Sequence, residues 1–411
     1  MANILGINLS ALSEDAVLKK ISDFLNDGGQ HYIVTPNPEI ILCAHKDEEL
    51  FYILNKADLA VADGFGLKLA GLLIGEKIPR LTGADLSIKV LELARREKIK
   101  VMLLNWHAGL SSSSEIREAL EKKFAGLDFS VLDIDRVKLL TETDRDKILA
   151  FGPEILFTNI GFPYQEKILF HNLKYLPTVR IGLGVGGAFD FISGKAKRAP
   201  RLLRLIGLEW LWRLIRQPKR WRRIYDAVFV FSAKMIKARF INTYLYRANV
   251  ACLLYKRENG LIKILLVSRE DDPSHWQMPQ GGRDGEDVAT AGARELREET
   301  GVKNFFTRAT FKNLHRYEFN SENGKQAYRG ATPQRHVYES KKYRYDYKGQ
   351  NQSLYIAEFL GKDEEIRINF WDHTAWKWVD ADRLVEEIHH VRQAGTKIFL
   401  DKFRSLDLEK D

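Results

Sequence analysis

The sequence is poor in cysteine and has no long apolar run. Among its 411 residues only Cys43 and Cys252 are cysteines, and they form no CxxC pair. This excludes a disulfide scaffold and a thiolate zinc cluster, and it fits a reducing compartment. No stretch reaches the roughly 18 to 20 apolar residues that span a bilayer, and the start lacks the features of a signal peptide. We therefore expect a soluble or peripheral cytoplasmic protein.

What the sequence does have is an ordinary globular composition with unevenly placed charge. Hydrophobic residues make up 45% and charged residues 29%, which excludes disordered and fibrous classes. The formal net charge is +9, but residues 191–250 alone hold fifteen Lys/Arg against Glu209 and Asp226, so the rest of the chain is net negative. A basic band of this kind attracts anionic lipid headgroups, polyphosphates or nucleic acid.

The first 190 residues alternate short aliphatic runs with helical patterns. Strands are predicted over 31–36, 57–63, 98–105, 154–161 and 178–186, and helices over 11–28, 38–56, 83–97 and 112–126. This rhythm predicts an α/β domain, residues 1–195, with a mainly parallel sheet and helices on both faces. The serine run before Glu115 predicts a helix start of the capping-box type.

Two further regions follow. Residues 196–242 form a basic, aromatic and helical appendage in which Pro218 starts a second helix. Residues 243–411 form the second domain. Its strands are predicted over 249–257, 262–269, 353–360 and 374–380, with one strong helix over 287–300 and a terminal helix.

A helix crowded with carboxylates carries the clearest chemistry. Glu295, Glu298 and Glu299 have i, i+3 and i+4 spacing, which places them on one helical face. Like charges at this spacing destabilise a helix unless a cation neutralises them. Mg²⁺ does this while it keeps several waters and accepts phosphate oxygens, so we expect all three to be metal ligands. The reaction implied is attack of water on a diphosphate linkage.

The residues around this helix complete the pattern. Arg294 can orient Glu298, and we predict both as catalytic residues. Gly281 and Gly282 let the backbone approach a bound diphosphate, and we predict them to bind substrate. With Glu286 before the helix, the segment is very close to a Nudix box.

The flanks of the box narrow the resemblance. Residues 246–250, 276–282, 349–352 and 372–378 resemble the RNA 5′-pyrophosphohydrolase and dinucleoside polyphosphate hydrolase branch, over about residues 244–405. The resemblance implies a Nudix α/β/α sandwich with Mg²⁺ as cofactor and a nucleoside diphosphate-linked substrate. Asp372 precedes His373 where the branch usually has a glutamate, which leaves the reach of this carboxylate to the metal open. We place His373 outside the catalytic set.

Five polar and glycine-rich segments follow predicted strands in the first domain. They are residues 35–39, 62–66, 80–85, 161–166 and 184–194. Because the carboxyl ends of parallel strands meet at one crevice, we expect a nucleotide ligand there. In this order the segments resemble the WecG/TagA/CpsF glycosyltransferase family, over about residues 3–235.

That resemblance implies inverting transfer of an N-acetylmannosamine-type sugar from UDP to a polyprenyl-diphosphate-linked acceptor. It implies Asp63 as the base that deprotonates the acceptor hydroxyl, with Thr35 and Asn37 lining the sugar and acceptor pocket. The residues implied to hold the UDP donor are Arg80, Asp85, Gln165, Gly184, Gly186 and Gly187. No metal is expected here, since Arg213, Arg220 and Arg223 can supply positive charge to the leaving diphosphate.

The basic band has three interpretations. Residues 196–240 interleave Arg/Lys with Trp210, Trp212, Trp221 and Tyr225, as in helices that lie in the headgroup plane of an anionic membrane. RNA is a competing partner, because arginine and aromatic side chains stack on bases. The third interpretation is an interdomain packing surface. We favour the membrane.

We therefore expect a bifunctional enzyme peripherally associated with the inner face of the cell membrane. One rival makes the first domain an inactive docking module, since residues 104–107 replace a Gly-Gly turn of the family. Another makes the hydrolase primary, with RNA 5′ ends as substrate. The donor sugar, the acceptor, the Nudix substrate and the oligomeric state stay open.

Overall fold

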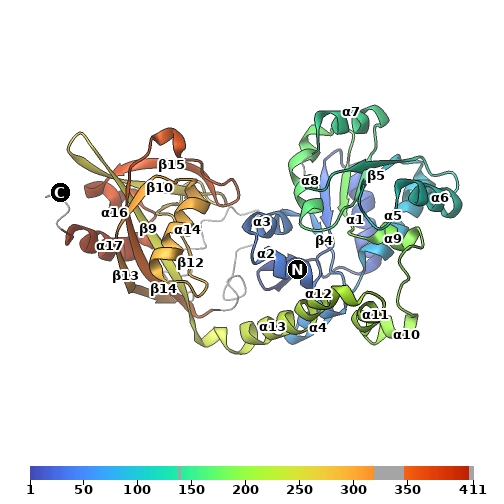
Figure 1. Ribbon diagram of the computed structural model, residues 1–411, viewed down its shortest axis with the longest axis horizontal. Helices are drawn as coiled ribbons and strands as arrows, with labels where there is room; N and C mark the ends of the chain where they lie inside the picture. Colours follow the sequence, from blue (N-terminus) through green and yellow to red (C-terminus); the bar gives the residue numbers. More distant parts are fainter. Residues whose placement is uncertain (138–139, 319–346, 407–411) are drawn as a thin grey trace. The chain divides into compact units, whose positions relative to one another are not determined.

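The computed structural model describes residues 1–137, 140–318 and 347–406, without the side chains of Arg201, Leu205 and Arg213. The chain forms two compact units, Met1–Ile236 and Lys237–Asp411 (Figure 1). Within the described ranges, every helix is too short or too polar to cross a bilayer.

The first unit is built on six parallel strands in the order β4-β3-β8-β7-β5-β6. They are β3 (His31–Val34), β4 (Leu59–Ala60), β5 (Val101–Trp106), β6 (Phe129–Ile134), β7 (Ile155–Asn159) and β8 (Ile181–Gly184). Most strand residues are aliphatic and buried, as expected for a parallel sheet covered on both faces. The predicted α/β class with a mainly parallel sheet is confirmed.

Helices cover both faces of this sheet (Figure 1). The sheet shares one hydrophobic core with α1 (Glu14–Asn26), α5 (Gly83–Glu97), α6 (Ser113–Lys123) and α9 (Ala188–Ile192). The others are α2 (Pro38–Ala44), α3 (Glu48–Lys56), α4 (Phe65–Leu73), α7 (Glu142–Phe151) and α8 (Tyr164–Asn172). A short hairpin, β1 (Ala2–Ile4) and β2 (Ile7–Leu9), precedes them.

Two helix predictions have different outcomes. The predicted single helix over 38–56 is wrong, because the chain leaves the helix at 45–47 and Asp47 starts α3 by accepting a hydrogen bond from the Leu50 N–H. The capping-box prediction is confirmed: Ser112 Oγ accepts from the Glu115 N–H, and the Glu115 carboxylate accepts from the Ser112 N–H.

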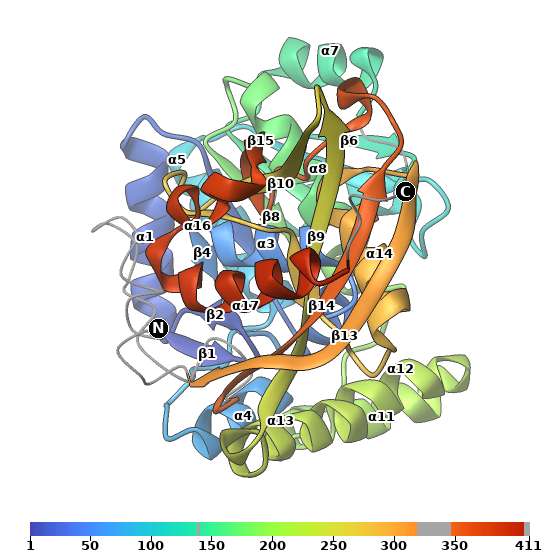
Figure 2. The same cartoon turned by 90° about the vertical axis from the view of Figure 1, so that its left-hand side faces the viewer.

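The basic appendage is a row of short helical segments (Figure 2). These are α10 (Arg201–Leu205), α11 (Glu209–Arg216), η2 (Pro218–Arg220), α12 (Trp221–Tyr225), the π-helical turn η3 (Asp226–Val230), α13 (Phe231–Phe240) and η4 (Asn242–Tyr244). Pro218 opens the turn that leads into α12, as predicted.

The second unit holds a seven-stranded mixed sheet with the path β11-β10-β9-β14-β13, to which β12 and β15 add at β9 and β10. The strands are β9 (Tyr246–Glu258), β10 (Leu261–Arg269), β11 (Trp276–Gln277), β12 (Gln280–Gly282), β13 (Phe305–Glu318), β14 (Gly349–Phe359) and β15 (His373–Asp380). Of the paired strands described, β9 and β14 run parallel and the other pairs are antiparallel.

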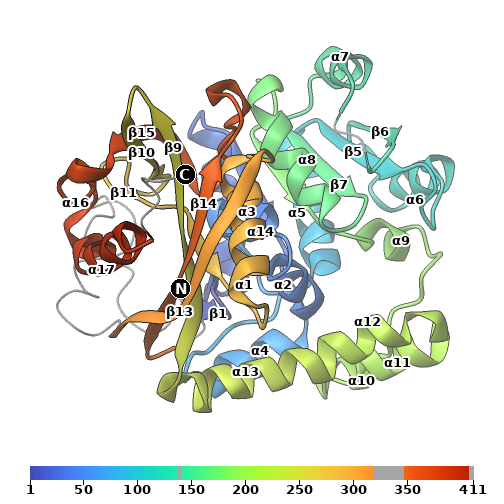
Figure 3. The ribbon, with the colours of Figure 1, turned by 60° about the vertical axis from the view of Figure 1, so that its left-hand side comes forward.

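The two faces of this sheet carry different helices (Figure 3). Along β9, Val250, Cys252 and Leu254 share a core with α14 (Val288–Thr300), while Ala251 and Leu253 join the core of α17 (Gln393–Arg404). This alternation is the strand period of two. The short segments η6 (Asp363–Glu365), η7 (Ala381–Arg383), α16 (Leu384–Glu387) and η8 (His390–Arg392) connect the rest. The predicted α/β/α sandwich is confirmed.

Candidate functional sites

In the first unit, the ends of β3 and β8 meet at Thr35. This buried side chain donates its hydroxyl hydrogen to the Gly184 carbonyl oxygen at 2.8 Å. A Cβ on Gly83, at the start of α5, would lie 3.2 Å from Thr35 Oγ1 and 3.3 Å from the Val185 carbonyl oxygen. The close approach of three chain segments therefore leaves little room for a side chain at position 83.

Asp63 lies against the same strand end. Its N–H donates to the Pro36 carbonyl oxygen at 2.8 Å. Asn37 uses its side-chain oxygen to accept from the Ile40 N–H and so starts α2. The pKa of the Arg198 guanidinium is raised mainly by its hydrogen bonds to Asp85, with smaller contributions from the charges of Glu209 and of the half-buried Asp63. The structure thus brings Thr35, Asn37 and Asp63 to one edge of the sheet.

Gln165 links α8 to the glycine loop after β8. Its Oε1 accepts from the Gly186 N–H at 2.8 Å, and a Cβ on Gly184 would lie 3.2 Å from its Nε2. Gly186 has φ +55°, a conformation that favours glycine. Gln165 and the loop through Gly187, both predicted to bind the donor, are therefore in direct contact.

Glu166 is a residue that the sequence reasoning missed. It is fully buried, and its Oε1 accepts from Gln165 Nε2 at 2.7 Å. Burial raises the pKa of Glu166 to about 7, against the smaller opposing effect of the Gln165 hydrogen bond. Among the described residues its Oε2 has no hydrogen-bond partner. No sequence pattern signals this burial, because a glutamate on a helix is usually exposed.

Three predicted donor-binding charges are engaged in ion pairs that join the basic appendage to the rest of the unit. Arg80 NH2 lies 2.7 Å from Glu209, and Arg223 NH2 lies 2.6 Å from Glu39. Asp85 accepts from Arg198 NH1 at 2.6 Å and from NH2 at 3.0 Å.

Burial acts to raise the pKa of Asp85, but hydrogen bonds from Arg198 and Thr82 outweigh it and lower the pKa.

Of the other arginines predicted to bind the leaving diphosphate, Arg220 is exposed, and the Arg213 side chain lies outside the described part of the structure.

The segment that departs from the family turn forms a buried polar network. Asn105 accepts from Asn159 Nδ2 at 3.0 Å and donates to Asp133 Oδ1 at 2.9 Å and to the Ser111 carbonyl oxygen at 3.2 Å. Beside it, the guanidinium of Arg136 lies 3.7 Å from the centre of the Trp106 ring. These contacts tie together the carboxyl ends of β5, β6 and β7.

In the second unit, α14 holds the predicted metal ligands. Asp287 starts the helix by accepting from the N–H groups of Ala289 and Thr290, and Gly301 ends it with φ +69°. Glu295 and Glu299 are 2% and 6% exposed, while the Glu298 side chain is 44% exposed. Two buried carboxylates and an open one share this helix face.

Arg294 connects the acids of this site. It donates to Glu286 at 2.9 Å, to Glu295 and Glu298 at 2.8 Å each, and to the Gly282 carbonyl oxygen at 2.8 Å. Burial acts to lower the pKa of Arg294, but the carboxylates outweigh it and raise the pKa above its usual range. Arg294 therefore holds the loop before the helix and two of the predicted ligands in fixed positions.

The glycine pair has a steric role in addition to the predicted one. A Cβ on Gly281 would lie 2.0 Å from Glu295 Oε2, and a Cβ on Gly282 would lie 2.4 Å from Arg247 NH2. Neither position has room for a side chain while Glu295 and Arg247 keep their places. Arg247 was not among the predicted site residues, although it lies in a flanking segment of the resemblance.

Glu299 contacts residues from two other elements. Its Oε2 accepts from the Gln280 N–H at 2.9 Å and lies 3.2 Å from His373 Nε2. Asp372 is half-buried, and burial, followed by the charge of Glu299, raises its pKa to about 6. The structure thus places Asp372 and His373 beside a predicted ligand.

The residues present fit a hard divalent cation. Glu295, Glu298 and Glu299 offer carboxylate oxygens, which are the ligands that Mg²⁺ takes. Buried carboxylates are stabilised by a positive charge, and Arg294 divides its charge among Glu286, Glu295 and Glu298. These three residues would hold the metal.

Comparisons with known proteins find two family matches along the chain. The profile of the glycosyl transferase WecG/TagA/CpsF family matches residues 2–244, and that of the NUDIX domain matches residues 245–399. An N-acetylglucosaminyldiphosphoundecaprenol N-acetyl-beta-D-mannosaminyltransferase of Bacillus spizizenii is 33% identical over 202 residues, which are 49% of this chain and 77% of the relative. The enzyme of the same name from Staphylococcus aureus strain MW2 is 29% identical over 245 residues, 58% of this chain and 92% of the relative.

Solved structures match about two fifths of the chain. C. elegans Ap4A hydrolase is 19% identical, with a TM-score of 0.27, over 39% of this chain and 98% of that one. The E. coli dihydroneopterin triphosphate pyrophosphohydrolase is 18% identical, with a TM-score of 0.26, over 38% of this chain and 99% of that one. From the two profiles and the curated relatives, the chain belongs to the WecG/TagA/CpsF glycosyltransferase family and carries a C-terminal Nudix hydrolase domain.

Proposed function

We propose that the first unit transfers an N-acetylmannosamine-type sugar from UDP to a polyprenyl-diphosphate-linked acceptor, with inversion. The names of the curated relatives support this substrate pair. The observation that carries the proposal is the gathering of Thr35, Asn37 and Asp63 beside the loop that Gln165 holds.

The residue types suit an inverting transfer. Such a reaction needs one carboxylate to take the proton of the acceptor hydroxyl, and Asp63 is the acid at this strand end. It also needs groups that stabilise the leaving diphosphate. We assign that role to the Gly184–Gly187 loop together with arginines of the appendage, so no metal is required in this unit.

The test is the product itself. The full-length protein, supplied with UDP-N-acetylmannosamine and a polyprenyl-diphosphate-linked N-acetylglucosamine, should form a disaccharide lipid whose new linkage has the inverted anomeric configuration by NMR. Transfer should continue in EDTA. Formation of no lipid product from any UDP-sugar would overturn the proposal and favour a docking role for this unit.

For the second unit we propose Mg²⁺-dependent hydrolysis of a nucleoside diphosphate-linked substrate. This proposal rests on the α14 face, where Arg294 bonds to Glu295 and Glu298 and where Glu299 lies one turn after Glu295. When bound there, the metal supplies Lewis acidity to the diphosphate and lowers the pKa of water. Glu298 is open to solvent, so it is suited to contact the attacking water.

Metal removal tests this proposal. EDTA should abolish hydrolysis and Mg²⁺ should restore it; hydrolysis that survives EDTA would overturn the metal assignment.

We propose further that the basic appendage docks on an anionic membrane surface. Support comes from Trp221, Tyr225 and Phe229, whose side chains are 55%, 52% and 55% exposed beside exposed arginines. Aromatic side chains at the headgroup level and cations on lipid phosphates are typical of interfacial helices. Leu69 and Leu72 of α4, which are 50% and 59% exposed, add apolar surface in the same unit.

Vesicle sedimentation tests the membrane proposal. The protein should sediment with vesicles that contain anionic lipid at low salt and leave them at high salt, because each cation near the surface contributes about 1 kcal/mol. Arg222→Glu should weaken sedimentation, and Arg96→Glu on α5 should not. Equal sedimentation with neutral vesicles, or none at low salt, would contradict docking; binding of RNA in place of vesicles would favour the rival partner.

A further inference from the structure

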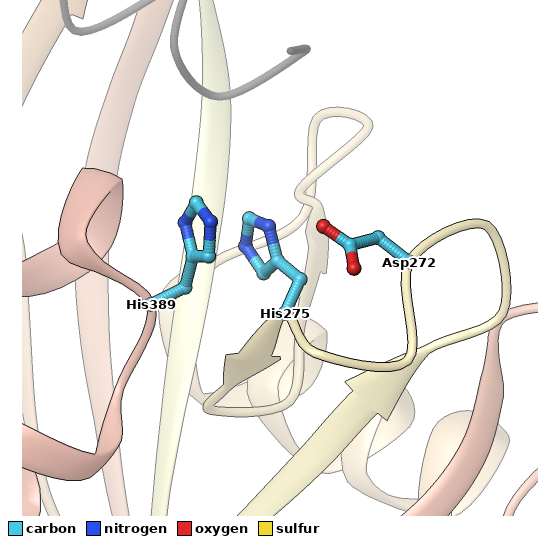
Figure 4. Close-up of side chains that lie close together, drawn as sticks. All are labelled: Asp272, His275 and His389. Atoms are coloured by element: carbon cyan, nitrogen blue, oxygen red, sulfur yellow. The ribbon is translucent and has the colours of Figure 1, made fainter. Parts of the chain in front are cut away.

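Two histidines and an aspartate lie close together in the second unit, outside the Nudix box. Asp272 and His275 belong to the connection between β10 and β11, and His389 lies between α16 and η8 (Figure 4). One ligand atom of each residue lies within 4.8 Å of the other two. Chain segments far apart in the sequence therefore supply nitrogen and oxygen ligands to one place.

The histidines carry buried nitrogens that nothing in the described part of the chain satisfies. Among those residues, neither His275 Nε2 nor His389 Nδ1 has a hydrogen-bond partner, and His275 is only 1% exposed. Buried polar atoms without partners are uncommon in native proteins, and a bound ion is one of the standard reasons for them.

The surrounding backbone fixes the cluster. The backbone N–H of His275 donates to the Asp272 carbonyl oxygen at 2.9 Å, and the backbone N–H of His389 donates to the Trp276 carbonyl oxygen at 2.9 Å. Ser274 donates its N–H and its hydroxyl to Asp272 Oδ1, at 3.1 and 2.6 Å. Hydrogen bonds of this kind orient the first ligands of metal sites.

Of the two arginines that act on the cluster, Arg269 is paired with a carboxylate and Arg392 bonds to a neutral hydroxyl. Arg269 is held by both carboxylate oxygens of Asp271, at 2.7 and 2.6 Å. Arg392 donates to the Tyr317 hydroxyl at 2.9 Å, and the ring of His390 lies 4.2 Å from that of His389.

Burial, helped by the charges of Arg269 and Arg392, lowers the pKa of His275 to about 2. Burial and the neighbouring His390 lower the pKa of His389. Both imidazoles are therefore neutral near pH 7, with lone pairs available to a metal.

We propose that Asp272, His275 and His389 bind a divalent transition-metal ion of the zinc type. Two imidazole nitrogens and one carboxylate oxygen are a ligand set that Zn²⁺ takes while it keeps a fourth position open. Mg²⁺ prefers oxygen ligands, so this site and the carboxylates of α14 select different ions. The ion would tie the β10–β11 connection to the segment before α17.

Binding requires one adjustment. The rings of His275 and His389 are stacked, with 3.9 Å between their centres and 10° between their planes, so their lone pairs do not yet converge. His389 is only half-buried, and a turn of its ring brings a nitrogen toward the ion. The ring nitrogen and carboxylate oxygen would then approach the bond lengths of about 2.0 to 2.2 Å that Zn²⁺ takes.

The test is zinc binding by the full-length protein in excess Mg²⁺, measured by calorimetry and by zinc content after dialysis. We expect one zinc per chain, and loss of it in His275→Ala and His389→Ala. Ser274→Ala, which removes a hydrogen bond to Asp272, should weaken binding at least about tenfold. Co²⁺ absorption should report the same nitrogen ligands.

Two controls separate this site from the rest of the molecule. Glu298→Gln in the box and His107→Ala in the first unit should bind zinc as the unchanged protein does. Because His275 is buried, a variant counts only if its unfolding temperature without zinc equals that of the unchanged protein. If His275→Ala does not fold, Asp272→Asn and His389→Ala, which lie at less buried positions, serve as the test. Zinc binding that is absent in the unchanged protein, or unaltered in these variants, overturns the proposal.

Discussion

The two units build their sites in opposite ways. In the first, the candidate residues come from separate strand ends, Thr35 after β3, Asp63 after β4 and the Gly184 loop after β8, and the sheet gathers them. In the second, three acids and Arg294 come from a single helix. A parallel sheet collects distant residues at one edge, whereas a helix concentrates charge that then needs a cation.

This difference also sets the electrostatics. In the first unit we assign the leaving diphosphate to the glycine loop and to arginines of the appendage, so we expect Asp63 and Gln165 to act without a metal. The α14 face holds Glu295, Glu298 and Glu299 against one arginine, and two of these carboxylates are buried. The comparison predicts one metal-independent and one metal-dependent reaction on the same chain.

The largest expected effect comes from Glu298→Gln. Loss of one carboxylate from the metal-binding face should lower hydrolysis by about 1,000-fold, equivalent to about 4 kcal/mol of transition-state stabilisation, and leave sugar transfer unchanged. Single-turnover kinetics measures the loss. Glu364→Gln, an exposed acid of the same unit, is the control. A near-unchanged hydrolysis rate in Glu298→Gln would refute its assignment.

Asp63→Asn should have the next effect. Removal of the general base should lower transfer by about 100- to 10,000-fold while UDP binding and hydrolysis persist. Asp135→Asn, at an aspartate that follows β6 and accepts a hydrogen bond from the Val137 N–H, should transfer normally. If the two variants behave alike, Asp63 is not the base.

Glu166 gives a pH signature confined to the first unit. Its pKa in the folded state is about 7, above the ordinary 4.5, so folding favours the neutral acid. The stability from this group is fully present below pH 4.5 and is lost as the pH rises toward 7, by about 3 kcal/mol at about 1.4 kcal/mol per pK unit.

Glu166→Gln should therefore reduce this loss, because a neutral amide keeps the hydrogen bond from Gln165. Urea unfolding of the first unit at pH 5 and pH 8 measures it, with Glu118→Gln on the exposed face of α6 as control. The same pH dependence in Glu166→Gln and the unchanged protein would show that Glu166 ionises freely.

The smallest expected effect concerns the ion pairs of the appendage. Arg80 and Glu209 are 19% and 16% exposed, so a double-mutant cycle should give a coupling energy of about 1 kcal/mol. The exposed pair Arg96–Glu97 should give close to zero. A coupling energy of zero would mean that the pair does not hold Arg80 in place, which would leave its guanidinium free to bind the UDP donor, the role that the family resemblance implies.

The sequence predicts features that depend on local pattern. Five of the six parallel strands and α14 follow from aliphatic runs and from helical spacing, which neighbouring residues decide, while β6 was not predicted. β13 was not predicted, because Phe305–Glu318 mixes charged with apolar residues and alternates exposed with half-buried positions, with no fully buried residue. The break in the helix over 38–56 was missed because Asp47 acts as a cap, an effect that the apolar spacing hides.

The candidate sites also divide into features that the sequence pattern predicts and features that depend on tertiary packing. The predicted segments around Thr35, Asp63 and Gln165 meet in space because topology dictates where strand ends lie. The pairing of Arg80 with Glu209 and the burial of Glu166 depend on tertiary packing and have no signal in the chain. The roles of these residues stay predictions until the variants are assayed.

The most direct test of two separate activities is product analysis by mass spectrometry. The unchanged protein, Asp63→Asn and Glu298→Gln would each receive Mg²⁺, a panel of UDP-sugars, the polyprenyl-diphosphate-linked acceptor, diadenosine polyphosphates and 5′-triphosphorylated RNA. The account predicts that Asp63→Asn loses only the glycolipid and Glu298→Gln loses only the hydrolysis product. Loss of both products in one variant, or persistence of both in either, would contradict it.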